Sequence, residues 1–237
     1  MKILMIPSRM LPIPPVKGGA VQNLINFYIE WNEKEKNNDL IVTSIYNEDA
    51  KNLSSELKNT VIEYTGRHRF LIKLMYKDIP KISGLAHKII NADYKKTIKK
   101  VIRQNKEKLD LVVLDNSTGY FELVRKEFDG KIAIHIYNDH LNSSVKNIDY
   151  IMKNVDRVIT VSEYNSDIVR KLGYGEKVVT LHNGVDISRF GNEYTRGQRN
   201  GIREKLNIKD DEIAIIFVAR LVPEKGIMEL IKAFSKI

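Results

Sequence analysis

Short apolar segments alternate along the chain with longer segments whose apolar residues recur at steps of three and four. Several short segments are nearly continuous runs of β-branched and aliphatic residues, as expected for parallel strands covered on both faces. The predicted strands are Lys2–Ile6, Leu40–Tyr46, Leu111–Asp115, Lys131–Ile136, Arg157–Ser162, Lys177–His182 and Ile213–Ala219. The predicted helices are Ala20–Lys36, Ser83–Lys108, Tyr120–Phe128, Asn142–Asn154, Glu163–Leu172 and Gly226–Ile237. This alternation predicts an α/β fold with a doubly wound parallel sheet.

A polar stretch, Asp186–Arg199, marks the boundary between a first α/β domain and a second that barely begins. We place the first domain at residues 1–182 and assign 183–237 to a crossover linker and the start of the second. That start holds a helix near Gly201–Leu206 and the apolar strand Ile213–Val218, which expects neighbours on both edges. We therefore expect the second part to pack against the first, to pair with a second chain, or to be poorly ordered.

The composition excludes several classes of protein. Of 237 residues, 43% are hydrophobic and 29% charged, which is ordinary for a globular protein. Cysteine is absent, so disulfides, thiolate nucleophiles and cysteine metal sites are excluded. No apolar run reaches the roughly 20 residues that a membrane-spanning helix needs, and Met1–Pro7 is too short for a secretory signal. We expect a soluble, cytoplasmic protein.

The net charge of +9 comes from one segment. Residues 67–108 contain 13 Lys or Arg and 3 Asp or Glu, whereas the other 26 basic and 27 acidic residues leave a net charge of −1. Within this segment, basic side chains face away from an apolar helix stripe: Lys95, Lys96, Lys99, Lys100 and Arg103. They form either a solvated surface or a dock for an anionic membrane or a phosphorylated acceptor. Nucleic acid is weakly supported, because no recognised motif accompanies them.

Candidate ligand-binding residues follow the predicted strands, because parallel sheets bind ligands at the carboxyl ends of their strands. Gly18 and Gly19 precede the first helix, where glycine lets backbone N–H groups approach an anion, although plain turn chemistry also explains them. His135 lies within a strand and reads as a packed core residue. His140 lies in the following loop, where an imidazole can act near neutral pH.

Two cations, Arg220 and Lys225, follow the last predicted strand at the start of a helix. Together they can stabilise negative charge that develops on a leaving diphosphate. The alternative is a surface ion pair with Glu224, worth about 0 to 1 kcal/mol.

Four segments, in order and each at a strand end, carry a resemblance to a known family. They are Pro14–Ala20, Asp156–Tyr164, His182–Asp186 with Phe190, and Ala219–Ile227 with Leu230, Ile231, Ala233 and Phe234. The chain resembles the retaining glycosyltransferases of family 4, which have two Rossmann-like domains in the GT-B fold. The resemblance implies an acceptor-side first domain and a donor nucleotide-binding second domain, here truncated.

The resemblance implies a hexosyltransferase that moves a sugar from a nucleotide-diphosphate sugar, such as a UDP-sugar, to a glycan or lipid-linked acceptor in glycan and cell-envelope biosynthesis. Arg220 and Lys225 would hold the donor diphosphate, with Gly18 and Gly19 facing it across the cleft. A second pair, Asn183 and Gly184, would shape that cleft. The resemblance implies no cofactor and no bound divalent metal. Peripheral contact with the inner face of an anionic membrane and self-association through the incomplete domain are also expected.

The sequence departs from the family pattern at two places. Tyr137 stands where the resemblance expects a histidine, so we nominate His140 as the catalytic side chain. The second domain stops early, which indicates either a fragment or a naturally shortened chain. We expect the 237-residue chain alone to be inactive. The other interpretations are a non-catalytic binding or coat-associated module of this fold, and a nucleotide-sugar epimerase.

Overall fold

The chain forms two compact units, Met1–Gly184 and Val185–Ile237, and each is described by itself. The structure, a computed structural model, describes residues 1–66, 80–191 and 193–236. The first part of the predicted basic segment 67–108, residues 67–79, therefore lies outside the described residues.

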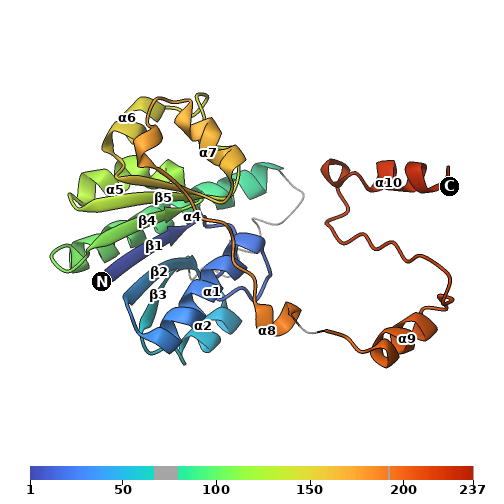
Figure 1. Ribbon diagram of the computed structural model, residues 1–237. Helices are drawn as coiled ribbons and strands as arrows, with labels where there is room; N and C mark the ends of the chain where they lie inside the picture. Colours follow the sequence, from blue (N-terminus) through green and yellow to red (C-terminus); the bar gives the residue numbers. More distant parts are fainter. Residues whose placement is uncertain (67–79, 192, 237) are drawn as a thin grey trace. The chain divides into compact units, whose positions relative to one another are not determined.

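The first unit is built on a seven-stranded sheet in the order β3-β2-β1-β4-β5-β6-β7. Every described pair of neighbours is parallel, which confirms the predicted doubly wound sheet (Figure 1). The strands are β1 (Lys2–Pro7), β2 (Asp39–Ile45), β3 (Thr60–Thr65), β4 (Leu111–Asp115), β5 (Lys131–Ile136), β6 (Arg157–Thr160) and β7 (Val178–Thr180). The strand order reverses on either side of β1, and such a switch point is where open α/β sheets bind ligands.

Helices cover both faces of this sheet. They are α1 (Ala20–Glu35), α2 (Glu48–Ser54), α4 (Pro80–Asn105), η1 (Thr118–Tyr120), α5 (Phe121–Glu127), α6 (Ile148–Asn154), α7 (Glu163–Arg170) and η2 (Gly175–Lys177). The larger apolar core lies between the sheet and α4, α5, α6 and α7. The smaller core lies on the opposite face, between α1 and strands β1 and β2.

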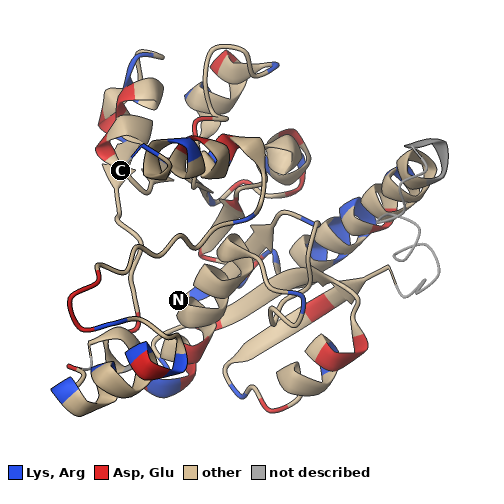
Figure 2. Cartoon of the chain, turned by 90° about the vertical axis from the view of Figure 1, so that its right-hand side faces the viewer, with Lys and Arg blue, Asp and Glu red and all other residues tan. Residues whose placement is uncertain are grey.

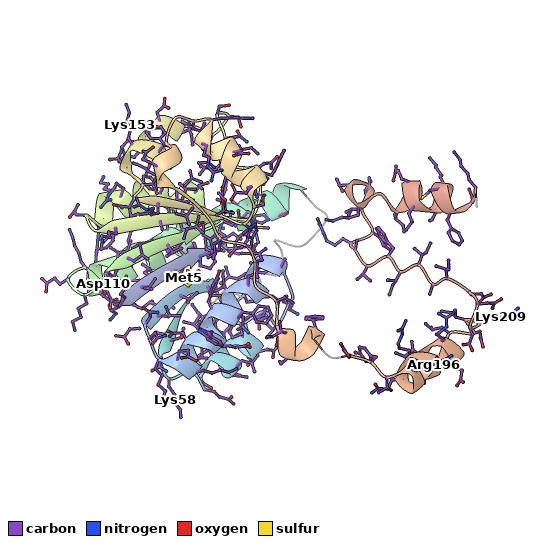
Figure 3. All side chains as sticks on the ribbon, in the orientation of Figure 1. Met5, Lys58, Asp110, Lys153, Arg196 and Lys209 are labelled. Atoms are coloured by element: carbon purple, nitrogen blue, oxygen red, sulfur yellow. The ribbon has the colours of Figure 1, made fainter. Side chains whose placement is uncertain are left out.

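Strand alternation decides which side chains enter which core. In β5, Ile132, Ile134 and Ile136 join the larger core, so Ala133 and His135 point to the opposite face. On that face α1 does not cover β7, where Val179 is 47% exposed, and Leu181 just after the strand is exposed to the same extent. Figure 3 shows Met5 within the sheet, whereas Lys58, Asp110 and Lys153 lie at the rim of the unit.

The sequence prediction differs from the structure in its polar segments. β3 and α2 were not predicted, and α6 begins only at Ile148. Residues 137–147 form a loop instead, where Asn138 and Asn142 accept hydrogen bonds from backbone N–H groups two residues later. Such local bonds compete with helix formation.

The second unit contains helices and no strand among its described residues. Its helices are α8 (Ile187–Phe190), α9 (Arg196–Lys205), η3 (Pro223–Lys225) and α10 (Ile227–Phe234). The predicted strand Ile213–Ala219 is absent from the structure, and Ile213 is 89% exposed. A strand needs a neighbour to bond its backbone, and the described part of this unit supplies none. Whether this segment pairs or packs stays a prediction.

Tyr94 ties α4 to the sheet at the carboxyl end of β1. Its fully buried hydroxyl donates to the carbonyl oxygen of Pro7 over 2.8 Å and lies 2.8 Å from the hydroxyl of Thr43 in β2. Burial raises the pKa of this hydroxyl far above its usual value, so it stays protonated. The carboxyl ends of β1 and β2 are thus fixed by one side chain.

Replacing Tyr94 by Phe should lower the free energy of unfolding by about 1–3 kcal/mol, because the Pro7 carbonyl loses its buried donor. Urea denaturation followed by the fluorescence of Trp31, the single tryptophan, measures this in the first unit. Tyr164→Phe is the matched control, since Tyr164 is 71% exposed. An equal effect of both substitutions would contradict the role given to Tyr94.

Candidate functional site at the carboxyl ends of the central strands

A buried polar cluster lies where β4 and β5 end. Asp115 is the last residue of β4, and the parallel register places His135 of β5 directly beside it. The two side chains point to the same face because paired residues in a sheet share one. Tyr137 follows two residues after His135, and its ring centroid lies 4.5 Å from that of His135.

Three polar atoms of this cluster are within contact distance of one another. The Tyr137 hydroxyl donates to Asp115 Oδ2 over 3.2 Å and lies 3.2 Å from His135 Nδ1. His135 Nδ1 also lies 3.3 Å from Asp115 Oδ2. The Tyr28 ring of α1 stands edge-on to the imidazole at 6.5 Å. Asp115, His135 and Tyr137 are called the Asp115 cluster below.

Burial sets the protonation of this cluster. Asp115 is fully buried, and loss of solvation raises its pKa although His135 and Tyr137 oppose the shift. Burial and the nearby Asp115 carboxyl also raise the pKa of Tyr137, so its hydroxyl remains a donor. Among the described residues, Asp115 Oδ1 and His135 Nε2 have no hydrogen-bond partner. The cluster therefore keeps unused capacity to hold a proton or bind a polar group.

A hollow of about 270 Å³ opens beside His135, between α1 and the sheet. Tyr28 and Trp31 of α1 form one wall, and Val113, Ile159 and Leu181 lie on the sheet side. The lining is mainly apolar, so this hollow suits a nonpolar group better than a diphosphate.

The loop between β1 and α1, residues 8–19, brings two glycines to the same edge of the sheet. The Ile13 amide donates to the Ser44 hydroxyl over 2.9 Å, and the Tyr64 hydroxyl donates to the Ile13 carbonyl over 2.9 Å. Gly18 and Gly19 have φ of 72° and 104°, which side chains rarely adopt. A Cβ on Gly19 would also lie 2.3 Å from Gln22 Oε1. Both positions therefore require glycine.

The first turn of α1 is open to an anion. Gly19 caps the helix without a side-chain hydrogen bond, and no acidic residue lies in the first turn. Amide N–H groups and the helix dipole favour negative charge at such an end. This agrees with the predicted contact between Gly18–Gly19 and a phosphate, which stays a prediction.

His140 makes no contact with the Asp115 cluster among the described residues, although it follows β5 in the same loop as Tyr137. It lies exposed in a turn, and its backbone N–H donates to Asn138 Oδ1 over 3.1 Å. No contact of its imidazole with the Asp115 cluster is found in the described part of the chain. Its catalytic role stays a prediction, while His135 is buried, as expected for a packed residue.

Asn183 and Gly184 lie exposed just after β7, at the end of the first unit. They follow His182, whose Nδ1 donates to the Val161 carbonyl over 3.2 Å. In the second unit, Arg220 and Lys225 are exposed and flank the turn that enters α10. The roles of all four residues in donor binding stay predictions.

The predicted basic surface of α4 is partly neutralised by nearby acids. Lys99 and Arg103 pair with Glu127 of α5 at 3.7 and 2.8 Å, and Lys100 lies 3.8 Å from Glu63 of β3. Figure 2 shows blue positions along this helix. A further pair joins Lys96 to Asp93 within α4 at 3.6 Å. Lys95 is exposed and has no ion pair with the described residues.

Sequence reasoning missed Asp115 as a site residue. The strands Leu111–Asp115 and Lys131–Ile136 were both predicted with the observed bounds. The signal available was a polar residue in an otherwise apolar strand end, Asp115 as the last residue of one strand and His135 as the second last of the other, and neighbouring parallel strands bring such residues together. What the sequence did not show was the register that pairs Asp115 with His135.

Comparison with known proteins confirms the resemblance to family 4 glycosyltransferases. The model of Glycosyltransferase Family 4 matches residues 76–189. YtcC of Bacillus subtilis, whose name assigns it provisionally to the glycosyltransferases, is 25% identical over 100% of this chain and 53% of its own length. Spore coat protein SA of the same organism is 24% identical over 100% of this chain and 57% of its own. The chain thus spans about half the length of these curated relatives.

The fold is confirmed as α/β of the GT-B type by a solved structure. HepE from Anabaena, in complex with UDP-glucose, matches with a TM-score of 0.60 and 15% sequence identity. The match covers 100% of this chain and 57% of that chain.

The described residues contain neither a helix that could span a membrane nor a side-chain cluster that could hold a metal ion. None of their helices is both long and apolar enough to cross a membrane. Within the same ranges, no three or more His, Asp or Glu side chains gather in a way that could hold a metal ion.

Replacing Asp115 by Asn should stabilise the first unit increasingly as the pH rises above about 4, the ordinary pKa of an aspartate. In the unfolded chain Asp115 ionises near pH 4, about its ordinary value. Burial holds its native pKa higher, so the native state binds a proton that the unfolded state has lost. The free energy of unfolding therefore falls as pH rises from the unfolded toward the native pKa, and Asn removes that loss.

Urea denaturation followed by Trp31 fluorescence at several pH values measures this difference. Asp139→Asn is the control, because it makes the same chemical change at an exposed position. A difference between wild type and Asp115→Asn that stays constant, or grows toward low pH, would contradict the assignment.

Proposed function

We propose that this chain is the acceptor-side half of a retaining glycosyltransferase that moves a sugar from a nucleotide-diphosphate sugar to an acceptor in glycan and cell-envelope biosynthesis. The observation that carries the proposal is the family 4 match over residues 76–189, which spans β4 to β7 and the strand ends described above. The activity is that of the whole protein, since this chain spans about half of its relatives. The isolated 237 residues are expected to be inactive.

The proposed chemistry is mainly electrostatic. As the bond from the anomeric carbon to the diphosphate breaks, negative charge grows on the leaving oxygens and the sugar becomes cation-like. Arg220, Lys225 and the amides at the start of α1 supply positive charge to those oxygens. The acceptor hydroxyl then attacks the anomeric carbon from the same face and passes its proton to the departing diphosphate oxygen, so the configuration is retained.

The donor is proposed to be a UDP-sugar, and the polar groups nearest the reaction are proposed to come from the loop after β5. HepE, which shares the fold, holds UDP-glucose. His140 is retained as the nominated catalytic side chain. Tyr137 is the alternative, because it occupies the position where the family resemblance expects a histidine and its hydroxyl is held by Asp115.

A second candidate function is a non-catalytic, coat-associated module. The likeness to Spore coat protein SA over the whole chain favours it. Incubation of the whole protein with radiolabelled UDP-sugars and a cell-envelope extract separates the candidates. Sugar transferred with retained configuration supports the transferase, an isomerised donor indicates an epimerase, and absence of donor binding supports the module.

Self-association is proposed through the second unit. Ile213, Ile216 and Val218 are between 86% and 89% exposed in the isolated chain, and exposed apolar runs of this kind favour pairing.

Arg220→Gln and Lys225→Gln should each lower kcat/KM for sugar transfer by the whole protein by about 100- to 1000-fold, because each removes a charge from the leaving diphosphate. Steady-state transfer rates measure the effect. Arg199→Gln is the control, as Arg199 is an exposed arginine of α9 in the same unit. Losses below two-fold at both positions would remove the basis of the proposed chemistry.

We propose peripheral contact between α4 and anionic membranes. The contact depends mainly on the positive charge of Lys95 and on the net positive charge that remains on α4 after its ion pairs are counted. Replacing Lys95, Lys96, Lys99 and Lys100 by Glu should abolish co-sedimentation with phosphatidylglycerol vesicles, because charge attraction is reversed. The control reverses an equal number of exposed lysines in the second unit: Lys205, Lys209, Lys232 and Lys236. Co-sedimentation that survives the first set of substitutions would refute membrane contact through α4.

A further inference from the structure

Arg9 lies two residues after the end of β1 and is held in place by neutral side chains. Arg9 Nε donates to Asn91 Oδ1 over 3.0 Å, and Arg9 Nη1 lies 3.1 Å from His87 Nδ1. His87 and Asn91 are four residues apart in α4, so both face the same way. Asn91 Oδ1 also accepts from the Tyr120 hydroxyl over 2.8 Å. The guanidinium is therefore held by two side chains of α4, one of which is itself held by Tyr120.

These contacts orient the charge of Arg9 without neutralising it. Because a guanidinium only donates, His87 Nδ1 must accept the hydrogen bond, which requires the neutral imidazole with its proton on Nε2. Asn91 and Tyr120 are uncharged as well. Among the described residues, no carboxylate lies within ion-pair distance of Arg9, whereas Arg103 and Arg170 each pair with a glutamate.

The location of Arg9 is as informative as its contacts. It is half-buried at the carboxyl end of β1, beside the switch point where parallel sheets bind ligands. Holding a partly desolvated charge without a counter-ion costs free energy, and a bound anion recovers that cost. A planar guanidinium carries five N–H donors and is the group that best matches a phosphate, and the contacts to Asn91 and His87 use only part of these donors.

We propose that Arg9 binds the phosphate group of a phosphorylated acceptor. This inference rests on the proposed function, which places the acceptor on the first unit and assigns the donor diphosphate to Arg220, Lys225 and the amides at the start of α1 rather than to Arg9. An anion at Arg9 is then a feature of the acceptor. The proposal narrows the acceptor to compounds with a phosphate close to the reacting hydroxyl, whether a sugar phosphate or a lipid-linked phosphate.

NMR of the 237-residue chain labelled with ¹⁵N at arginine tests the proposal without any turnover. The probe is inorganic phosphate, added against sodium chloride at equal ionic strength. We expect the Arg9 Nε–Hε resonance to shift saturably with phosphate and not with chloride. No saturable shift, or the same shift with chloride, overturns the proposal. Because this readout uses the unaltered chain, it does not depend on the folding of a variant.

Variants then test whether the guanidinium group of Arg9 accounts for phosphate binding. Arg9→Gln and Arg9→Lys should each weaken phosphate binding at least ten-fold, since a lysine keeps the charge but not the two-pronged geometry. Binding is followed on other resonances that shift in the wild type. Lys88→Gln is the matched control, because Lys88 is an exposed residue next to His87 on the same helix and its replacement changes the net charge equally. Equal weakening by Lys88→Gln would overturn a specific site.

Competition with two further ligands tests whether the Arg9 site binds the acceptor or the donor. A sugar 1-phosphate should displace inorganic phosphate from Arg9, whereas UDP should do so at least ten-fold less effectively. Stronger displacement by UDP would overturn the assignment to the acceptor. Absence of sugar transfer by the whole protein would instead count against the proposed function, and the phosphate titration remains interpretable in that case.

Discussion

The parallel register of β1, β4 and β5 is the constraint on which the rest of the candidate site depends. It sets Pro7 beside Asp115 and Asp115 beside His135, so three strands end at one line across the sheet. Backbone hydrogen bonds fix this line, and α4 reinforces it when Tyr94 donates to the Pro7 carbonyl. A shift of the strand register by one residue would point the Asp115 side chain into the larger apolar core, where no polar group could form a hydrogen bond with it. Polar side chains can be buried here only because the register is unambiguous.

The fold could be predicted largely from hydrophobic runs, because strands buried on both faces leave little choice of side chain. Six of the seven strands of the sheet were predicted in this way. β3 was missed because it lies at the sheet edge and mixes Glu63 and Tyr64 with β-branched residues, so its pattern is only partly apolar. The opposite error occurred at Ile213–Ala219, where an apolar run predicted a strand. Apolar character gives a segment the tendency to pair, but the hydrogen bonds of a strand come from a neighbour that a single segment does not reveal.

The candidate site was less predictable, because its chemistry depends on contacts between segments. Glycines at positions 18 and 19 were identified from sequence, and their positive φ angles show why they are needed. His140 was chosen because it lies in the loop that follows Lys131–Ile136, where the family resemblance expects a histidine. The buried polar groups instead come from Asp115 and His135, which looked like ordinary strand residues until register brought them together. Burial then changes their chemistry by raising the pKa of Asp115, an effect with no counterpart in the linear sequence.

The charged residues also show that contacts between distant segments decide what a side chain can bind, and that the composition of one segment does not. The long helix α4 holds the highest density of lysine in the described chain, and it attracted attention for that reason. Yet Glu127 and Glu63, from distant segments, take up much of that charge, and exposed pairs of this kind contribute little to binding or stability. Arg9 stands alone in the sequence and draws no notice there. Because His87 and Asn91 hold it without cancelling its charge, its field remains available to a ligand. For recognition of an anion, a single oriented and unneutralised guanidinium outweighs several lysines that already have partners.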